Sequence, residues 1–171
     1  MKDNLHDNRK SYEKGELSQN TAAKNPLQQF KNWIYECQDY GGVDEVNAMT
    51  LTTIDGQGFP RGRVVLLKRY DENGFYFYTN YNSEKGQSIQ LNNKVSLSFF
   101  WPNLERQVII KGTAQKISNL ASETYFHSRP KGSQIGALVS NQSSVIKDRS
   151  VLENQLKELE ATYKNKDVPM P

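Results

Sequence analysis

The chain has 171 residues, of which 36% are hydrophobic, and a formal net charge of +3 at pH 7. This length fits one domain and excludes a large multidomain enzyme. The near balance of charge argues against a protein that mainly coats nucleic acid or a membrane. The single cysteine excludes an intrachain disulfide, and with only two histidines it excludes a zinc framework. Because no signal peptide or long apolar run is present, we expect a cytoplasmic protein with no membrane or nucleic-acid partner.

The N-terminal part of the chain is polar up to the first clear helix signal. Residues 1–24 show no helical or strand period, which predicts a mobile arm ahead of a domain formed by residues 25–171. Asn25 and Pro26 are typical of an N-cap and a first helical residue. Apolar residues then recur at helical spacing, namely Leu27, Phe30, Ile34 and Cys37. This stripe predicts a buried face and makes Cys37 a core residue rather than a nucleophile.

From Ala48 the apolar period changes to two, and β-branched and aromatic residues become frequent. The strands that this period predicts are 48–54, 61–70, 75–79, 95–101 and 107–117. Turn residues separate the first three of them, so we expect antiparallel hairpins. Five or six strands with aromatic-rich interiors favour a small closed barrel over an open sheet. The expected fold class is mainly β with flanking helices.

Helices are also expected between and after the strands. A short one should follow the segment 82–86, another should run from Ser118 or Asn119 to His127, and Asp148 can cap a third. In the last helix the apolar stripe consists of Leu152, Leu156, Leu159 and Tyr163.

Two segments near the strands carry candidate anion ligands. In the first, residues 82–86, Ser83 can cap the helix or donate to an anion and Lys85 adds a charge; an ordinary capped helix with a solvated lysine is the alternative. The second, residues 61–69, holds four cations around an apolar centre, which either bind an anion or protect a sheet edge. In a regular strand Arg63 and Lys68 face opposite sides, so they reach one ligand only at a strand end or a bulge.

A further candidate site follows in the helical part. Tyr125 and Arg129 share a helix face, and Ser133 lies just beyond Pro130. A phenol, a guanidinium and a hydroxyl together suit a phosphomonoester. Three neutral polar residues can hydrogen-bond the edge of a heteroaromatic ring: Gln107, Gln142 and Ser143. The alternative is that they are ordinary exposed polar residues. We assign no catalytic residue and no metal ligand, so a bound cofactor is expected to supply the chemistry.

Six motifs occur in a defined order: Arg63-Val-Val-Leu-Leu-Lys68, Phe77-Tyr-Thr-Asn80, Leu104-Glu-Arg-Gln-Val108, Tyr125-Phe-His-Ser-Arg-Pro130, Ser133-Gln-Ile-Gly-Ala137 and Gln142-Ser-Ser144. With them the chain resembles the pyridoxamine 5′-phosphate oxidases from about Arg9 to its end. The resemblance implies an antiparallel FMN-binding split β-barrel that forms a homodimer. It also implies oxidation of pyridoxamine 5′-phosphate or pyridoxine 5′-phosphate to pyridoxal 5′-phosphate, with hydride transfer to the flavin and oxygen reduced to hydrogen peroxide.

The resemblance also implies roles for individual residues. The implied FMN contacts are Arg63, Val64, Val65, Leu66, Leu67, Lys68, Tyr78, Thr79, Ser83, Lys85, Gln107, Gln142 and Ser143. The implied substrate contacts are Arg9, Tyr12, Lys68, Tyr125, Arg129 and Ser133, of which the first two belong to an arm that covers the substrate.

The chain departs from the family pattern at two places. Glu84 stands where many members have an arginine, so we expect modestly weaker FMN binding. Members also continue beyond the position of Pro171, and we expect this domain to lack that C-terminal segment. One alternative is a non-catalytic flavin- or haem-binding split barrel, but such a protein has no use for the Tyr125 phosphate site. Another is a barrel that binds single-stranded nucleic acid, for which the net charge is low.

Overall fold

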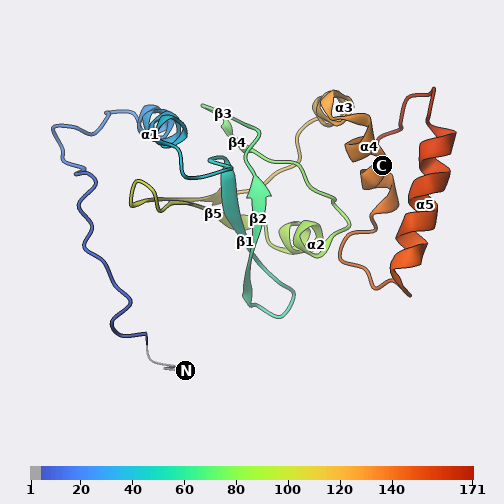
Figure 1. Ribbon diagram of the computed structural model, residues 1–171, viewed down its shortest axis with the longest axis horizontal. Coiled ribbons are helices and arrows are strands. Elements are labelled where there is room, and N and C mark those ends of the chain that lie inside the picture. The colour runs from blue at the N-terminus through green and yellow to red at the C-terminus, as the bar shows by residue number, and fades with distance from the viewer. Residues whose placement is uncertain (1–4) are drawn as a thin grey trace. The chain divides into compact units, whose positions relative to one another are not determined.

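The computed structural model describes residues 5–171 and shows an antiparallel sheet with flanking helices (Figure 1). The helices are α1 (Pro26–Tyr40), α2 (Glu84–Leu91), α3 (Asn119–Ser128), α4 (Lys131–Val139) and α5 (Arg149–Thr162). The strands are β1 (Ala48–Ile54), β2 (Pro60–Leu66), β3 (Arg69–Asp71), β4 (Gly74–Tyr76), β5 (Lys94–Trp101) and β6 (Arg106–Thr113). The expected fold class is confirmed, although helices occupy more residues than strands.

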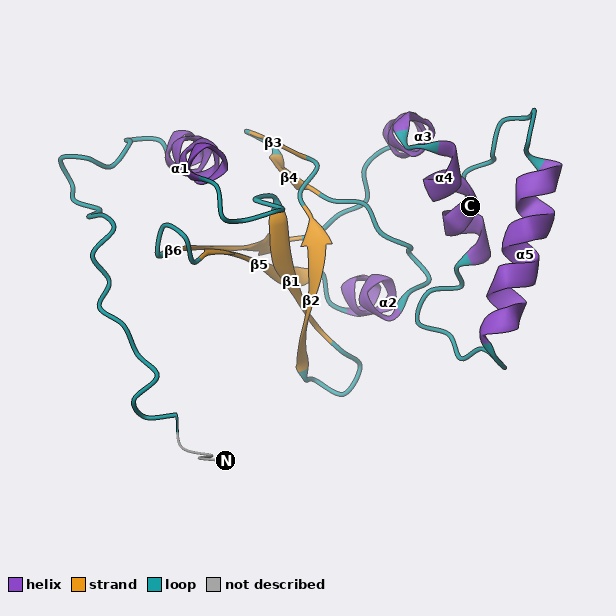
Figure 2. Cartoon of the chain, viewed as in Figure 1, coloured by secondary structure: helices purple, strands orange, loops and turns teal. Residues whose placement is uncertain are grey.

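The strands form two sheets (Figure 2). One has the order β2-β1-β5-β6, and β3 pairs with β4 antiparallel in the other. Within residues 5–171 the hydrogen bonding leaves β2 and β6 as the edge strands of the larger sheet. The strands therefore form two sheets in place of the closed barrel expected from composition.

The prediction of one strand over residues 61–70 is wrong, because the strand ends at Leu66. The Leu67 N–H donates to the carbonyl of Asn47, and the next N–H, of Lys68, donates to the carbonyl of Tyr76 in β4. Two successive residues therefore bond to partners on different elements. The predicted strand 75–79 is likewise too long, since β4 ends at Tyr76.

Most helix starts follow the predicted caps. The side chain of Asn25 accepts from two N–H groups of α1, and Ser83, Ser118 and Asp148 cap α2, α3 and α5. Helix α4 was not expected. It contains two glycines and begins after Pro130 without a side-chain cap, so the local signals for it are weak.

The described chain divides into two compact units, and the first comprises residues up to Leu51 together with 64–76 and 97–110. Its core is aromatic. The ring of Phe30 on α1 lies 5.0 Å from that of Tyr70, 5.1 Å from Phe99 and 6.0 Å from Trp101, between ring centroids. Such contacts each add about 0.5–1.5 kcal/mol beyond burial. Cys37 is fully buried in this unit, which confirms it as a core residue.

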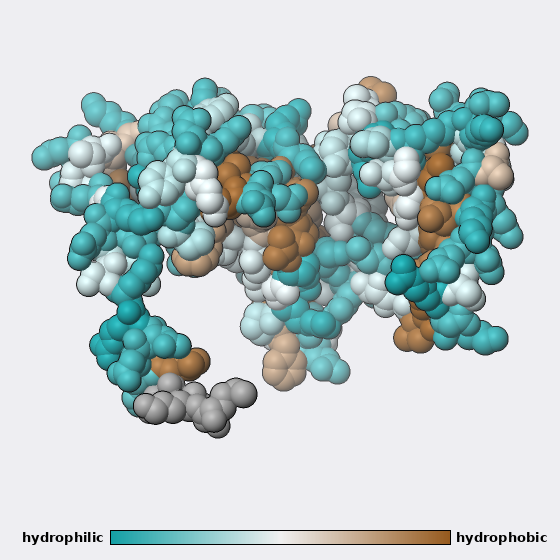
Figure 3. Space-filling view, in the orientation of Figure 1, coloured by the Kyte–Doolittle hydropathy of each residue, from teal (hydrophilic) through white to brown (hydrophobic). Residues whose placement is uncertain are grey.

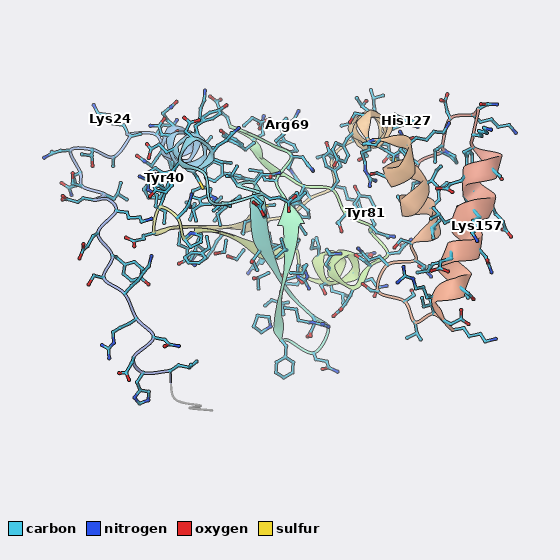
Figure 4. All side chains as sticks on the ribbon, in the orientation of Figure 1. Lys24, Tyr40, Arg69, Tyr81, His127 and Lys157 are labelled. Atoms are coloured by element: carbon cyan, nitrogen blue, oxygen red, sulfur yellow. The ribbon has the colours of Figure 1, made fainter. Side chains whose placement is uncertain are left out.

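The second unit comprises residues 52–63, 77–96 and 111–171. Phe126, Ile135 and Val168 form its buried cluster, against which apolar residues of α4 and α5 pack (brown in Figure 3). His127 on α3, labelled in Figure 4, has Nε2 3.0 Å from the carbonyl oxygen of Val168. This contact connects the C-terminal segment around Val168 to α3. In the described part of the chain no helix has the length and apolar character needed to cross a membrane.

Candidate functional site

Two cations of the second unit lie close together, Arg63 on β2 and Lys85 in the first turn of α2. Arg63 Nη1 donates to the hydroxyl of Thr53, which is buried, at 2.8 Å. Lys85 Nζ donates to Gln142 Oε1 at 2.6 Å and to Ser83 Oγ at 3.3 Å. Burial, and then the charge of Arg63, lower the pKa of Lys85. Positive charges held this close favour the binding of an anion.

The pKa of Arg63 is lowered as well, first by burial and then by the charge of Arg61. The structure therefore groups three cations of the second unit near the start of α2. The family resemblance implied Arg63 and Lys85 as cofactor contacts; Arg61 entered the sequence analysis only as one of the four cations of residues 61–69, with no assigned role.

The turn into α2 is tightly built. Ser83 is fully buried; its hydroxyl donates to the carbonyl of Asn80 at 2.6 Å and accepts from the Gly86 N–H at 3.4 Å. A Cβ on Gly86 would lie 2.2 Å from the carbonyl oxygen of Tyr81, so a side chain there requires the backbone to move. The free N–H groups at the start of α2 are thus held in place next to Lys85.

Glu84, the residue expected to weaken an anion site, has a partner. Its carboxylate forms an ion pair and hydrogen bond with the guanidinium of Arg61. The two side chains retain 40% and 52% of their exposure. The negative charge of Glu84 therefore has a cation beside it, which nothing in the sequence indicated.

A second cluster of polar groups surrounds Tyr125 on α3. Its ring stacks on that of Tyr78, with 3.5 Å between centroids and 9° between planes. Burial raises the pKa of Tyr125, the charge of Arg129 opposes this effect, and Tyr78 adds to it. The phenol therefore stays protonated at neutral pH and can donate a hydrogen bond. Arg129 follows α3 as its C-cap and is half-buried.

Gln134, a residue that sequence reasoning missed, supports the turn that carries Arg129. Its side chain is largely buried, and Nε2 donates to the carbonyls of Arg129 at 2.8 Å and of His127 at 3.3 Å. These carbonyls lie at the end of α3, where helical partners are missing. The one sequence signal is a polar residue next to the apolar run 135–139. Ser133 lies beside it and is exposed.

The remaining candidate residues are divided between the units. Tyr78 and Thr79 are half-buried in the second unit, where Gln142 and Ser143 are exposed. The first unit holds Arg9, Tyr12, Val64–Lys68 and Gln107. Among these, Leu67 is buried, Lys68 and Tyr12 are exposed, and Gln107 Nε2 donates weakly to Ser98 Oγ at 3.4 Å.

Two solved structures have the same fold as this chain. A crystal structure of PhzG from Burkholderia lata 383 in complex with tetrahydrophenazine-1-carboxylic acid superposes with a TM-score of 0.81 at 24% identity, over 89% of this chain and 74% of that one. A pyridoxamine 5′-phosphate oxidase-related, FMN binding protein from Nostoc punctiforme PCC 73102 gives a TM-score of 0.60 at 16% identity, over 77% and 71% of the two chains. The chain therefore shares its fold with these two proteins.

Sequence relatives define the family. The family model described as pyridoxamine 5′-phosphate oxidase matches residues 41–163. A pyridoxine/pyridoxamine 5′-phosphate oxidase of Flavobacterium johnsoniae is 56% identical over 167 residues, which cover 98% of this chain and 78% of the relative. The corresponding protein of Flavobacterium psychrophilum is 53% identical over 171 residues, or 100% and 79% of the two chains. The chain belongs to the pyridoxamine 5′-phosphate oxidase family, as its six motifs predicted.

Proposed function

We propose that the protein is an FMN-dependent oxidase that converts pyridoxamine 5′-phosphate or pyridoxine 5′-phosphate to pyridoxal 5′-phosphate and reduces oxygen to hydrogen peroxide. The observation that carries the proposal is the stack of Tyr78 on Tyr125. Tyr78 belongs to the residues proposed for FMN, and Tyr125 belongs to those proposed for the substrate phosphate. Their contact supports a site that takes both molecules side by side.

The residues at the start of α2 fit a cofactor that carries a phosphate. Arg63 and Lys85 both have lowered pKa values, and an anion between them would relieve their repulsion. Ser83 and the first N–H groups of α2 would add hydrogen bonds. When bound, the flavin supplies the acceptor for the hydride. Gln142, which contacts Lys85, would bond a polar edge of the ring system without adding charge.

The substrate would be held through its own phosphate. Tyr125 would donate its phenolic hydrogen, Arg129 would offer the paired N–H groups of its guanidinium, and Ser133 would add a hydroxyl. Lys68 would contribute a further cation, while Arg9 and Tyr12 of the arm would cover the bound substrate and exclude water. Each residue here binds or orients; none is proposed to move a proton.

The assembly and location implied by the family resemblance are part of the same proposal. We propose a homodimer that works in the cytoplasm. Sedimentation of the purified protein measures the first, and a single species with the mass of one chain would contradict it.

The test of the proposed function is an assay of the full chain. The purified protein should show the visible spectrum of oxidised flavin, and adding pyridoxamine 5′-phosphate should yield equal amounts of hydrogen peroxide and pyridoxal 5′-phosphate. Unphosphorylated pyridoxamine is the matched control and should react far more slowly. A yellow protein that yields neither product from either phosphate substrate would instead be a flavin binder without this activity.

A further inference from the structure

We propose that Arg61 is a further ligand of the cofactor phosphate, and that Glu84 orients it. The inference rests on the proposed binding of FMN and adds a residue that neither the motifs nor the resemblance assigns to the site. It also gives a role to Glu84, which on charge alone should oppose the binding of a phosphate.

Arg61 lies beside the residues proposed to bind the cofactor phosphate. Arg61 and Arg63 are two residues apart on β2, and side chains at this spacing leave a strand on the same side. Arg61 lies near enough to Arg63 to lower the pKa of the second guanidinium. Its partner Glu84 is the first residue of α2 and precedes Lys85. The Arg61 guanidinium is therefore placed at the start of α2, beside both proposed phosphate ligands.

The guanidinium of Arg61 can bond Glu84 and a phosphate at the same time. Arginine has five N–H donors in a plane, and the contact with Glu84 is made through Nη1. The remaining donors can bond phosphate oxygens while the carboxylate keeps the side chain in place. Since 52% of the Arg61 side chain is exposed, a ligand can reach these donors.

Arg61 also changes the balance of charge around Glu84. Glu84 alone would place a negative charge next to Lys85 and repel a phosphate dianion. With Arg61 included, three cations face one carboxylate, so the net charge of the group is positive. Exposed ion pairs contribute little to stability, and variants of this pair should therefore keep the fold.

The experiment compares FMN with riboflavin, which has the same ring system and no phosphate. The full chain freed of flavin is titrated with each ligand, and Kd is read from quenching of flavin fluorescence. Arg61→Gln should raise the Kd for FMN about tenfold, the size expected for one lost charge-assisted bond, and leave the Kd for riboflavin unchanged. Arg149→Gln, which breaks another exposed Arg–Glu pair of the same unit, is the matched control and should change neither Kd.

A double variant separates contact with the phosphate from simple neutralisation of Glu84. Arg61→Gln combined with Glu84→Gln should bind FMN about tenfold more weakly than Glu84→Gln alone. Equal Kd values for these two proteins would overturn the inference, because Arg61 would then serve only to neutralise Glu84. An equal loss of riboflavin and FMN in Arg61→Gln would also overturn it.

The result for the unaltered protein separates failure of the proposed function from failure of the role proposed for Arg61. If it binds neither flavin, the proposed function falls and this inference falls with it. Arg61→Lys provides a second variant that keeps the charge and loses the planar fork; it should bind FMN with an intermediate Kd. A value equal to that of the unaltered protein would contradict a role for the paired donors of the guanidinium, because lysine has a single donor nitrogen.

Discussion

Lys10 Nζ lies 2.8 Å from Glu105 Oε1, so a residue of the irregular N-terminal segment is paired with the turn between β5 and β6. The other carboxylate oxygen of Glu105 accepts the backbone N–H groups of Glu13 at 2.8 Å and Lys14 at 3.1 Å. Only 7% of the Glu105 side chain is exposed. One carboxylate thus anchors the segment that carries the proposed substrate contacts Arg9 and Tyr12.

This anchor predicts a pH-dependent attachment of the arm. The hydrogen bond from Lys10, with further help from the two N–H groups, lowers the pKa of Glu105. A carboxyl with a lowered pKa in the folded protein contributes fully above its ordinary value, and the contribution is lost as pH falls through the lowered value. Cleavage of residues 5–24 by an acid-tolerant protease should therefore become faster at low pH.

Glu105→Gln should produce the same release at neutral pH, where limited proteolysis can be compared directly. Glu16→Gln changes an exposed residue of the arm itself and serves as the control. Identical cleavage rates for Glu105→Gln and the unaltered protein would show that this carboxylate does not hold the arm.

The hydroxyl of Tyr125 should contribute to substrate binding separately from its ring. Tyr125→Phe keeps the ring that stacks on Tyr78 and removes the donor. We expect KM for pyridoxamine 5′-phosphate to rise about tenfold with little change in kcat. Tyr163→Phe, in the apolar cluster of the same unit, is a matched control. A fall in kcat without a change in KM would contradict a role in phosphate binding.

Lys85 should make FMN binding depend on pH. Its pKa is lowered in the flavin-free protein by burial and by Arg63. A bound anion favours the protonated lysine, so Kd for FMN should increase as pH rises through that lowered value, over a range below the ordinary pKa of lysine. The FMN phosphate is already a dianion above about pH 7 and adds no titration of its own there.

Lys85→Met should bind FMN more weakly and lose this dependence, which titrations at several pH values can measure. Arginine keeps its charge throughout the range, so Arg63 does not produce the same profile. An unchanged pH profile in Lys85→Met would assign the dependence to another group.

Gly86 should tolerate no side chain. In Gly86→Ala the added Cβ would lie 2.2 Å from a backbone oxygen, and relief of this clash should lower the free energy of unfolding by about 1–3 kcal/mol. Gly132→Ala is the control, because nothing lies within 4 Å of its Cβ position. That substitution should stabilise α4 by up to about 1 kcal/mol. Urea denaturation measures both, and equal changes would contradict the close approach.

Local signals were sufficient for much of the fold. The caps of α1, α3 and α5 depend on side chains that bond to N–H groups two or three residues away, and these were predicted. Strand β1 has the predicted bounds, because its burial alternates residue by residue. The burial of Cys37 was likewise predicted from its helical spacing to other apolar residues.

The features that sequence reasoning missed depend on residues distant in the chain. The strand break after Leu66 occurs because Leu67 and Lys68 bond to Asn47 and Tyr76, which the local period does not reveal. The pairing of Arg61 with Glu84 joins β2 to α2. Helix α4 lacks a cap and relies on packing of Ile135 against Phe126 and Val168. Tertiary contacts decide each of these cases.

The buried thiol of Cys37 provides a built-in reporter of motion in α1. It is fully inaccessible, its Sγ lies 3.5 Å from both side-chain polar atoms of Asn103, and the chain contains one cysteine. A thiol reagent can therefore modify it only after the helix moves away. The labelling rate measures how often this opening occurs. Because a single site reacts, the modified fraction can be counted from intact mass without any engineered probe.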